Sequence, residues 1–486
     1  MITAASIIKN LPSAIRAACR KTTASLESSS PPACRFAFQR SVVKTLLVSF
    51  FALIFLFLLA TQASAKTWYI KVDGTGDAPT IQAGIDSAAV GDTVLVGPGI
   101  YSDTLQIMID NEPKVVNVHM YKNIKLVAEG NPLNTRIDGS NSDIAIYVEN
   151  VDSTACIGGF NIRTQSWGVI CLLPEDSSPA QEDWEPVGIR CRSSSLIITQ
   201  NTFNDNFTGI ELFKSSAKIL GNEIINSGRG IWCRDSSEAD IRQNRISEAV
   251  ELIICWHSNA TICDNDLFWG SEPSAFSCYG ISCLQASPYI SGNHIVGMVN
   301  AGIGCNGGNP VIEDNQLEWS FANIELQGTP FAVIRRNVVL EGTIGIDMLG
   351  VSGGVIENNT IIGSGIVAEV SYPLIRNNIV YKGTIWCFGS SLALECNNVF
   401  IPSRPITEIC TVPIGTNGNI SADPQFCGIE GSGNYYLQDD SPCAPGNHPD
   451  GYDCGLIGTF GVSCGIDPVT QKTWGIIKSL YEGTTL

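Results

Sequence analysis

An asparagine recurs about every 22 residues through the middle of the chain, always in the same local frame. An apolar residue usually lies three positions before it and two positions after it, as with Ile198 and Phe203 around Asn201. Self-similarity of this period is typical of a solenoid, in which each repeat buries its apolar residues against its neighbours. The ten asparagines of the set are Asn201, Asn222, Asn244, Asn265, Asn293, Asn315, Asn337, Asn359, Asn378 and Asn397.

The apolar positions within each repeat alternate, which indicates short strands and not helices. Gly, Asn, Asp and Ser separate the strands and supply the turns. We therefore predict an all-β fold, a single-stranded right-handed parallel β-helix with rungs of about 22 residues spaced about 4.8 Å apart. The asparagine tolerates the left-handed conformation that a bend can need, and its amide can bond the copies above and below it. We interpret the set as a structural ladder.

A second frame, Gly-Ile-x-Cys, repeats beside the asparagines, as in residues 230–233 and 280–283. Alternation points its fourth place inward, and rungs at this spacing hold parallel Cβ atoms slightly too far apart for a disulfide. We expect a mainly reduced core ladder there, with one or two strained bridges. Better disulfide candidates are Cys427 with Cys443 and Cys454 with Cys464. The cysteines of the ladder are Cys171, Cys191, Cys233, Cys255, Cys283 and Cys305.

Residues 45–60 are almost wholly apolar, follow Arg40 and Lys44, and precede Ala63, Ser64 and Ala65. This pattern predicts a secretory signal cut after Ala65, with an uncleaved membrane anchor as the alternative. After cleavage we expect no stable membrane span. The protein would be secreted, or held at the cell surface or in the periplasm of a bacterium. Sixteen of the 18 cysteines follow Ala65, and an even count agrees with export.

The chain carries 29 Lys and Arg against 47 Asp and Glu, a formal net charge of −18. Seven of the basic residues and one acidic residue precede position 66, so the remainder carries a net charge of −24. A surface this acidic disfavours nucleic acid as a partner, and it keeps an exported protein soluble. We expect a monomer.

Solenoids need caps at their ends. A short helix from Thr80 to Ala89, N-capped by Thr80 and apolar at Ile81, Ile85 and Ala88, would cover the first rung. The resulting division is a leader and signal peptide (1–65), an N-terminal cap and first strand (66–114), the β-helix (115–400), an irregular cysteine-containing segment (401–464) and a tail with a short helix (465–486).

Three groups of residues resemble the bacterial secreted right-handed β-helix proteins of the pectin-lyase-like superfamily, over roughly residues 67–445. These are the asparagine ladder, an N-terminal run and a C-terminal run. The resemblance implies a polysaccharide partner held outside one parallel sheet, here the Gly-Ile-x-Cys strands. Polygalacturonase motifs and the basic cluster of calcium-dependent pectate lyases have no counterpart, so the reaction stays open. The runs are Val72-Asp73-Gly74-Thr75-Gly76, Thr80-Ile81-Gln82, Gly91-Asp92-Thr93-Val94, Gly97-Pro98-Gly99-x-Tyr101, Asp423-Pro424-x-Phe426 and Ser441-Pro442-Cys443.

Alternation turns the third place of the Gly-Ile-x-Cys frame, and the place after the cysteine, toward the outside. One outward patch is bounded by two insertions, residues 172–187 and 268–279. Its aromatic rings offer flat faces to sugars and its arginines can grip a carboxylate; Glu211 and Arg234 are its acid or base candidates. The alternative is that the insertions cover the rings and form a side core. The predicted substrate-binding residues are Arg190, Trp232, Trp256, His257, Trp184 and Trp269.

A second outward patch pairs Glu325 with Asp347 on adjacent rungs, about 5 Å apart at the backbone. Carboxylates at this spacing raise the pKa of one another. They suit the catalytic pair of a retaining glycosidase or a Ca²⁺ site, with two solvated acids as the alternative. The sequence predicts a protein that binds an extracellular polysaccharide on this face. Cleavage, by a hydrolase or a lyase, is left open, and a non-catalytic surface or structural solenoid is the alternative.

Overall fold

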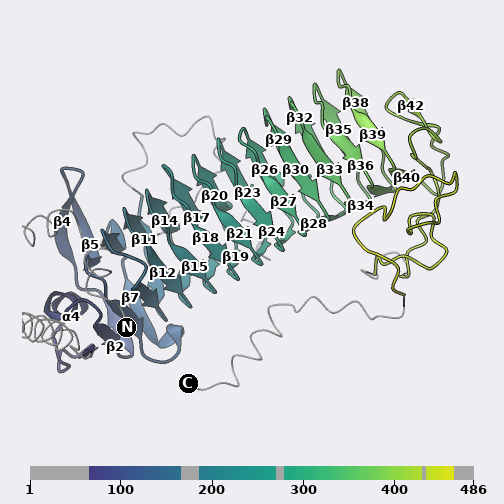
Figure 1. The fold of residues 1–486 in the computed structure, drawn as a ribbon. Helices are drawn as coiled ribbons and strands as arrows, with labels where there is room; N and C mark the ends of the chain where they lie inside the picture. The colour runs from purple at the N-terminus through teal and green to yellow at the C-terminus, as the bar shows by residue number, and fades with distance from the viewer. Residues whose placement is uncertain (1–64, 166–184, 270–277, 429–433, 465–486) are drawn as a thin grey trace, which may run out of the picture. The chain divides into compact units, whose positions relative to one another are not determined.

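The computed structural model describes residues 65–165, 185–269, 278–428 and 434–464 (Figure 1). It confirms the predicted all-β solenoid: three sheets run along the molecule, and each rung contributes one short strand to each sheet. The predicted signal segment, Trp184 and the tail helix lie outside the described residues. Within the described part of the chain, no helix is long and apolar enough to cross a membrane.

Sheet A holds the strands whose ends lead into the ladder asparagines. Its strands, in spatial order, are β1 (Thr67–Ile70), β2 (Thr93–Val96), β6 (Lys125–Ala128), β9 (Ala155–Gly158), β12 (Leu196–Thr199), β15 (Lys218–Leu220), β18 (Asp240–Arg242), β21 (Thr261–Cys263), β24 (Tyr289–Ser291), β27 (Val311–Glu313), β30 (Ala332–Arg335), β33 (Gly354–Glu357), β36 (Leu374–Arg376) and β39 (Ala393–Glu395).

Sheet B begins directly after the asparagines. Its strands are β3 (Gly99–Tyr101), β7 (Thr135–Asp138), β10 (Asn161–Arg163), β13 (Thr202–Asn204), β16 (Glu223–Ile225), β19 (Arg245–Ser247), β22 (Asp266–Phe268), β25 (His294–Val296), β28 (Gln316–Glu318), β31 (Val338–Leu340), β34 (Thr360–Ile362), β37 (Ile379–Tyr381) and β40 (Asn398–Phe400).

Sheet C contains the Gly-Ile-x-Cys strands. It is formed by β4 (Leu105–Ile109), β5 (Glu112–Met120), β8 (Ile144–Glu149), β11 (Val187–Arg192), β14 (Thr208–Phe213), β17 (Arg229–Arg234), β20 (Glu251–Trp256), β23 (Tyr279–Leu284), β26 (Ala301–Asn306), β29 (Ala322–Gln327), β32 (Ile344–Leu349), β35 (Ile366–Glu369) and β38 (Ile385–Phe388).

All pairings within these sheets are parallel except that of β4 with β5. A two-stranded antiparallel ribbon, β41 (Glu408–Ile409) and β42 (Val412–Pro413), and a 3-10 helix, η1 (Pro132–Asn134), complete the strand regions. The predicted capping helix is α4 (Ile81–Ser87). The Thr80 hydroxyl accepts a hydrogen bond from the Ala83 N–H, and Ile81 and Ile85 are buried at the end of the core.

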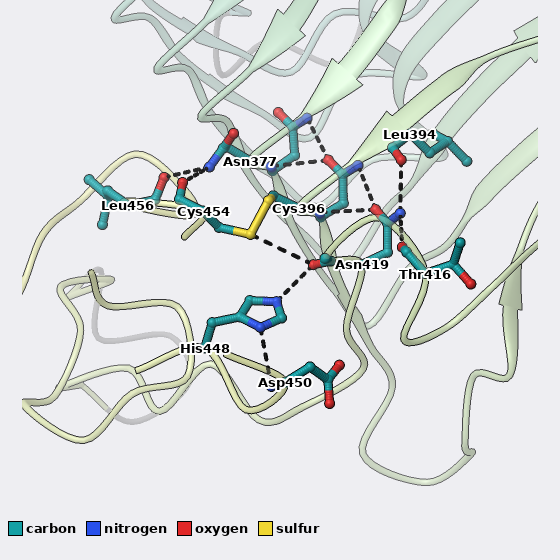
Figure 2. The surroundings of a disulfide bond; sticks show 12 residues. Asn377, Leu394, Cys396, Thr416, Asn419, His448, Asp450, Cys454 and Leu456 are labelled. Atoms are coloured by element: carbon teal, nitrogen blue, oxygen red, sulfur yellow. Dashed lines mark hydrogen bonds between the residues drawn. A yellow bond between two sulfur atoms is a disulfide. The ribbon is translucent and has the colours of Figure 1, made fainter. Parts of the chain in front are cut away.

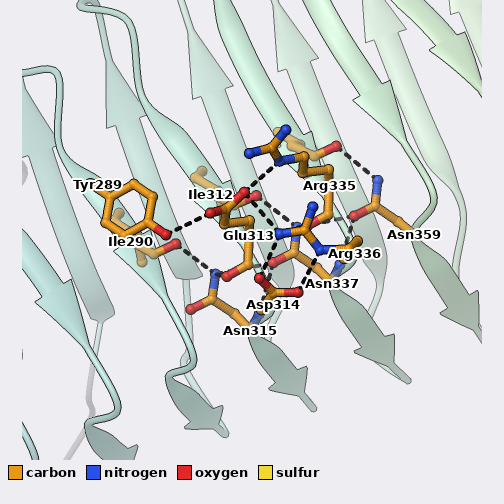
Figure 3. Close-up of polar contacts among 11 residues, drawn as sticks. Tyr289, Ile290, Ile312, Glu313, Asp314, Asn315, Arg335, Arg336, Asn337 and Asn359 are labelled. Carbon is orange, nitrogen blue, oxygen red and sulfur yellow. Dashed lines mark hydrogen bonds and ion pairs between the residues drawn. The ribbon is translucent and has the colours of Figure 1, made fainter. Parts of the chain in front are cut away.

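The asparagine ladder is confirmed and is one member longer than predicted, because Asn419 continues it beyond the last strands. Each Nδ2 donates to the Oδ1 of the next asparagine at 2.9–3.1 Å, as Figure 3 shows from Asn315 to Asn359. The expectation that the asparagine itself adopts the left-handed conformation is wrong. The residue before each one does so, with φ between 52° and 72°. That residue makes the bend, and the asparagine bonds the rungs together.

The inward column of sheet C places Cys233, Cys255, Cys283 and Cys305 in consecutive register. These thiols and that of Cys191 are free and buried, so the strained bridges expected among the ladder cysteines are absent from its described members. Burial raises the pKa of the Cys191 thiol. The described ladder cysteines therefore act as small apolar core residues in the slot that Leu212, Leu326 and Met348 fill on other rungs.

The C-terminal segment is fastened to the solenoid by disulfides, but the expected pairings are wrong. Cys427 bonds Cys464 across 37 residues, Cys454 bonds Cys396 across 58 residues, and Cys443 is free. A further bridge joins Cys387 to Cys410. Figure 2 shows Cys396 at the ladder turn, where the loop carrying Cys454 docks and His448 Nε2 lies 2.9 Å from the Gly418 carbonyl oxygen. The rungs supply Cys387 and Cys396, whereas the bridge between Cys427 and Cys464 closes within the C-terminal segment, and local spacing could not reveal either arrangement.

Candidate functional site

The strand register of sheet C confirms which residues share its outer face. One outward column runs Tyr147, Arg190, Glu211, Trp232, Ile254, Ser282, Gly304, Glu325, Asp347, Val367 and Trp386. The second runs Glu149, Arg192, Phe213, Arg234, Trp256, Leu284, Asn306, Gln327, Leu349, Glu369 and Phe388.

Glu211 is the centre of a buried ion-pair cluster in the N-terminal half of this face. Its carboxylate lies 2.6 Å from Arg190 Nε and 2.7 Å from Arg234 Nη2, and its side chain is 0% exposed. Burial alone would raise the pKa of Glu211, but the two guanidinium groups outweigh burial and hold that pKa below its ordinary value. An ionised, doubly paired carboxylate is poorly suited to deliver a proton, so the cluster favours a structural role for Glu211 and Arg234.

Trp232 and Trp256 meet edge to face, with ring centroids 5.3 Å apart. The guanidinium carbons of Arg229 and Arg234 lie 4.6 Å and 4.8 Å from the Trp232 ring centroid, and Trp232 is 1% exposed. Of the two interpretations left open by the sequence, this burial favours a side core for Trp232. His257, by contrast, is exposed in the turn after β20.

Trp269 lies away from this patch, in the turn that follows β22 of sheet B. It is 39% exposed and aligns with Gly297 on the next rung, which leaves room for its ring. The Trp269 N–H donates to the Val296 carbonyl, which aligns Trp269 with Gly297. In the same way the Gly297 N–H donates to the Glu318 carbonyl, so Trp319 holds this position one rung further on. Trp269 therefore belongs to the boundary between sheets B and C.

Glu325 and Asp347 face each other in register on β29 and β32, as predicted. Both side chains are half-buried. Burial, followed by the charge of Asp347, raises the pKa of Glu325. Burial and the charge of Glu369 raise the pKa of Asp347, although the Met348 backbone N–H opposes that rise by stabilising its charged form. Burial is the larger cause of both rises, and the predicted mutual effect acts in one direction, because the charge that raises the pKa of Asp347 is that of Glu369.

Two residues that sequence reasoning missed extend this acid pair. The Tyr279 ring lies against Gly304, where an added Cβ would come within 3.0 Å of it. Burial, Glu325 and Glu251 together raise the pKa of the Tyr279 hydroxyl. Glu251 pairs with Tyr279 in register and is 14% exposed, and burial raises its pKa to about 7 against the opposing charge of Arg229.

The signal for Glu251 was its position at the start of its sheet C strand, one place before the Gly-Ile-x-Cys frame, where its register neighbours are Arg229 and Tyr279. Alternation had assigned only the third place of the frame and the place after the cysteine to the outer face. With a pKa of about 7, Glu251 is able to exchange protons near neutral pH. Among the residues that the structure describes, no group of three or more His, Cys, Asp or Glu side chains is arranged to hold a metal ion.

The family model described as the right handed beta helix region matches residues 134–288, 187–318 and 279–420. No curated protein matches the chain. These matched ranges span more than half of the chain and include every described residue of the patches above.

Three solved structures share the fold. The PL6 family alginate lyase AlyGC has a TM-score of 0.43 at 12% identity, over 83% of this chain and 59% of that chain. A GH87 alpha-1,3-glucanase catalytic domain has a TM-score of 0.37 at 10% identity, over 67% and 64%. The Dettilon tailspike protein has a TM-score of 0.36 at 14% identity, over 72% and 64%. The chain spans less than two thirds of each of these three chains, and such likeness concerns the fold alone.

Proposed function

The chain belongs to the right-handed β-helix family, and on this premise we propose that it is an exported, monomeric protein that binds a polysaccharide along the outer face of sheet C and hydrolyses it. The observation that carries the proposal is the pair Glu325 and Asp347. The two half-buried carboxyls lie in register on adjacent strands, and each has a raised pKa. A carboxyl group that keeps its proton toward neutral pH is what a general acid requires.

The two carboxyls are not equivalent, and the difference assigns their roles. Asp347 has the Met348 N–H to stabilise its charge, whereas burial and the charge of Asp347 raise the pKa of Glu325 with no such donor opposing them. Glu325 therefore donates its proton to the glycosidic oxygen, and the ionised Asp347 attacks the anomeric carbon. Strands about 4.8 Å apart place the pair near the separation of about 5–5.5 Å that is typical of retaining glycosidases.

The surroundings of the pair suit a sugar ring. Gly304 carries no side chain beside Glu325 in the outward column, and the Tyr279 ring forms a flat wall over it. A sugar placed against this wall would present its glycosidic bond to Glu325. Water then hydrolyses the ester formed with Asp347, and Glu325, now ionised, takes a proton from that water, which restores both carboxyl groups.

The test is hydrolysis by purified residues 66–486, with and without Ca²⁺, on pectate, alginate, hyaluronan, xylan and neutral glucans. Release of reducing ends is expected, with loss of about a hundredfold to ten-thousandfold in the Glu325→Gln and Asp347→Asn variants. Glu395→Gln is the matched control, because Glu395 is an exposed acid on sheet A. Unsaturated uronic ends would overturn hydrolysis in favour of a lyase. A folded protein with no product on any substrate would favour the alternative, a non-catalytic solenoid.

A further inference from the structure

A groove of about 670 Å³ lies between the outer face of sheet B and the C-terminal segment. Sheet B contributes the strand ends around Glu318, Leu340 and Tyr381, and the C-terminal segment contributes Phe426 and Tyr435. This sheet B groove is separate from the outer face of sheet C, since none of the residues that line it belongs to a sheet C strand. We propose that it binds a segment of a neutral polysaccharide.

Aromatic rings form one wall of the sheet B groove. The Phe426 ring meets Tyr381 and Tyr435 edge to face, at centroid distances of 5.8 Å and 5.6 Å. A wall of rings that joins the solenoid to the C-terminal segment gives a sugar apolar faces to pack against. The disulfide between Cys454 and Cys396 fixes the C-terminal segment to the ladder turn, and Cys427, next to Phe426, is bonded to Cys464 within the segment.

Trp319 stands at the rim of the groove and is 65% exposed. Its backbone is left-handed with φ of 60°, which is regular for this turn position, since Glu341 on the next rung has φ of 53°. What sets Trp319 apart is therefore its large apolar ring, left in solvent beside the groove. An exposed indole at the rim of a groove offers a flat face on which a sugar ring can pack.

The polar groups of the groove select the charge of that ligand. Glu318, Glu341 and Asp423 line it, together with the amides of Gln316, Gln425 and Gln438, and no lysine or arginine does. These groups accept hydrogen bonds from sugar hydroxyls and repel carboxylates, so an uncharged glycan fits and a polyuronate does not.

The groove shares its rungs with the acid pair. Trp319 precedes β29, which carries Glu325, and Glu341 precedes β32, which carries Asp347. One turn therefore separates the groove from the acid pair on each of these two rungs. A glycan held in the groove would continue over that turn toward the acid pair, so the groove acts as a holding site. This inference extends the proposed function but is tested independently of it.

The experiment measures binding of neutral hexasaccharides (β-1,4-glucose, β-1,4-xylose, β-1,3-glucose and α-1,4-glucose) to residues 66–486 by isothermal titration calorimetry. At least one is expected to bind, about tenfold more weakly to Trp319→Ala, as for the loss of an aromatic anchor. Phe331→Ala is the matched control, because Phe331 is a 52% exposed aromatic outside the groove, and its binding should equal that of the unmodified protein. A hexasaccharide of galacturonate should not bind.

The proposal is overturned if no neutral hexasaccharide binds, if Trp319→Ala binds as tightly as Phe331→Ala, or if the galacturonate hexasaccharide competes for the site. The inactive Glu325→Gln protein separates the two proposals. Its unchanged binding together with lost hydrolysis supports both. Binding that depends on Trp319, in a protein that cleaves nothing, would leave the groove standing and remove the hydrolase.

Discussion

Replacement of Asn315 by alanine tests whether the ladder holds the solenoid together. Its Nδ2 donates to the Ile290 and Glu313 carbonyls and to Asn337 Oδ1, each at 3.0 Å. Its Oδ1 accepts from the backbone N–H and the Nδ2 of Asn293. Asn315 is 1% exposed, so water does not replace these partners without rearrangement.

The loss of unfolding free energy depends on which groups are left without a hydrogen-bond partner. The Asn293 Nδ2 keeps the Ile262 and Ser291 carbonyls, and Asn337 Oδ1 keeps the backbone N–H of residue 315. The Asn293 backbone N–H loses its acceptor, whereas the Ile290 carbonyl stays within the parallel pairing of β24 with β27. At about 1–3 kcal/mol for one buried group left unpaired, the substitution should lower the free energy of unfolding by about 1–3 kcal/mol.

Urea unfolding followed by circular dichroism measures this loss. Asn306→Ala is the matched control, because Asn306 is exposed on sheet C and its Nδ2 bonds Gln327 Oε1 at 3.0 Å. The control should change the unfolding free energy by less than about 0.5 kcal/mol. If Asn315→Ala were no more destabilising than Asn306→Ala, the hydrogen bonds of the ladder would contribute nothing net, and the repeated asparagine would need another explanation.

Two further predictions concern buried charge. Burial raises the pKa of Glu251 from 4.5 to about 7, so the folded protein binds the extra proton and loses stability as pH rises between these values. The free energy of unfolding of Glu251→Gln, relative to that of the unmodified protein, should therefore rise by up to about 3 kcal/mol between pH 4 and pH 8. An equal stability difference at both pH values in urea unfolding would refute this. Glu211→Gln leaves Arg190 and Arg234 without their carboxylate and should destabilise by about 3–5 kcal/mol. Glu357→Gln, which removes the partner of the half-exposed Arg376, should cost less than about 1 kcal/mol, and similar losses for both variants in the same assay would argue against a buried cluster.

Much of the fold could be predicted because its signals repeat. The spacing of the asparagines gave the rungs, and alternation within the Gly-Ile-x-Cys frame gave the outward columns that the register confirms. The hydroxyl of Thr80 followed by Ile81 and Ile85 gave the capping helix. Each of these is a local pattern whose physical cause, a bend, a pleat or a helix cap, acts within a few residues.

Features that depend on contacts distant in the sequence could not be predicted. The left-handed residue before each asparagine can be Gln200, Arg336 or Cys396, so no residue type marks it. The pairing of Cys396 with Cys454 depends on how the C-terminal segment docks. Alternation correctly predicted that Trp232 lies on the outer face, but it carries no information on whether other side chains bury the ring there. The sheet B groove joins residues about 100 positions apart, as Trp319 and Phe426 are.

The side chain of each ladder asparagine reaches no further than the adjacent rungs, so the ladder can form with any number of rungs. A duplication of one whole repeat, such as the 22-residue step from Asn315 to Asn337, would restore every bond of the ladder. Residues gained in a loop are tolerated too, since the 28-residue step from Asn265 to Asn293 keeps its ladder bond, whereas a gain within a strand would shift the inward and outward places. The outer faces can therefore lengthen or shorten over generations only in steps of about 4.8 Å. Such a step is close to the length of one sugar unit, so a lineage of these proteins could adjust its reach along a glycan one unit at a time.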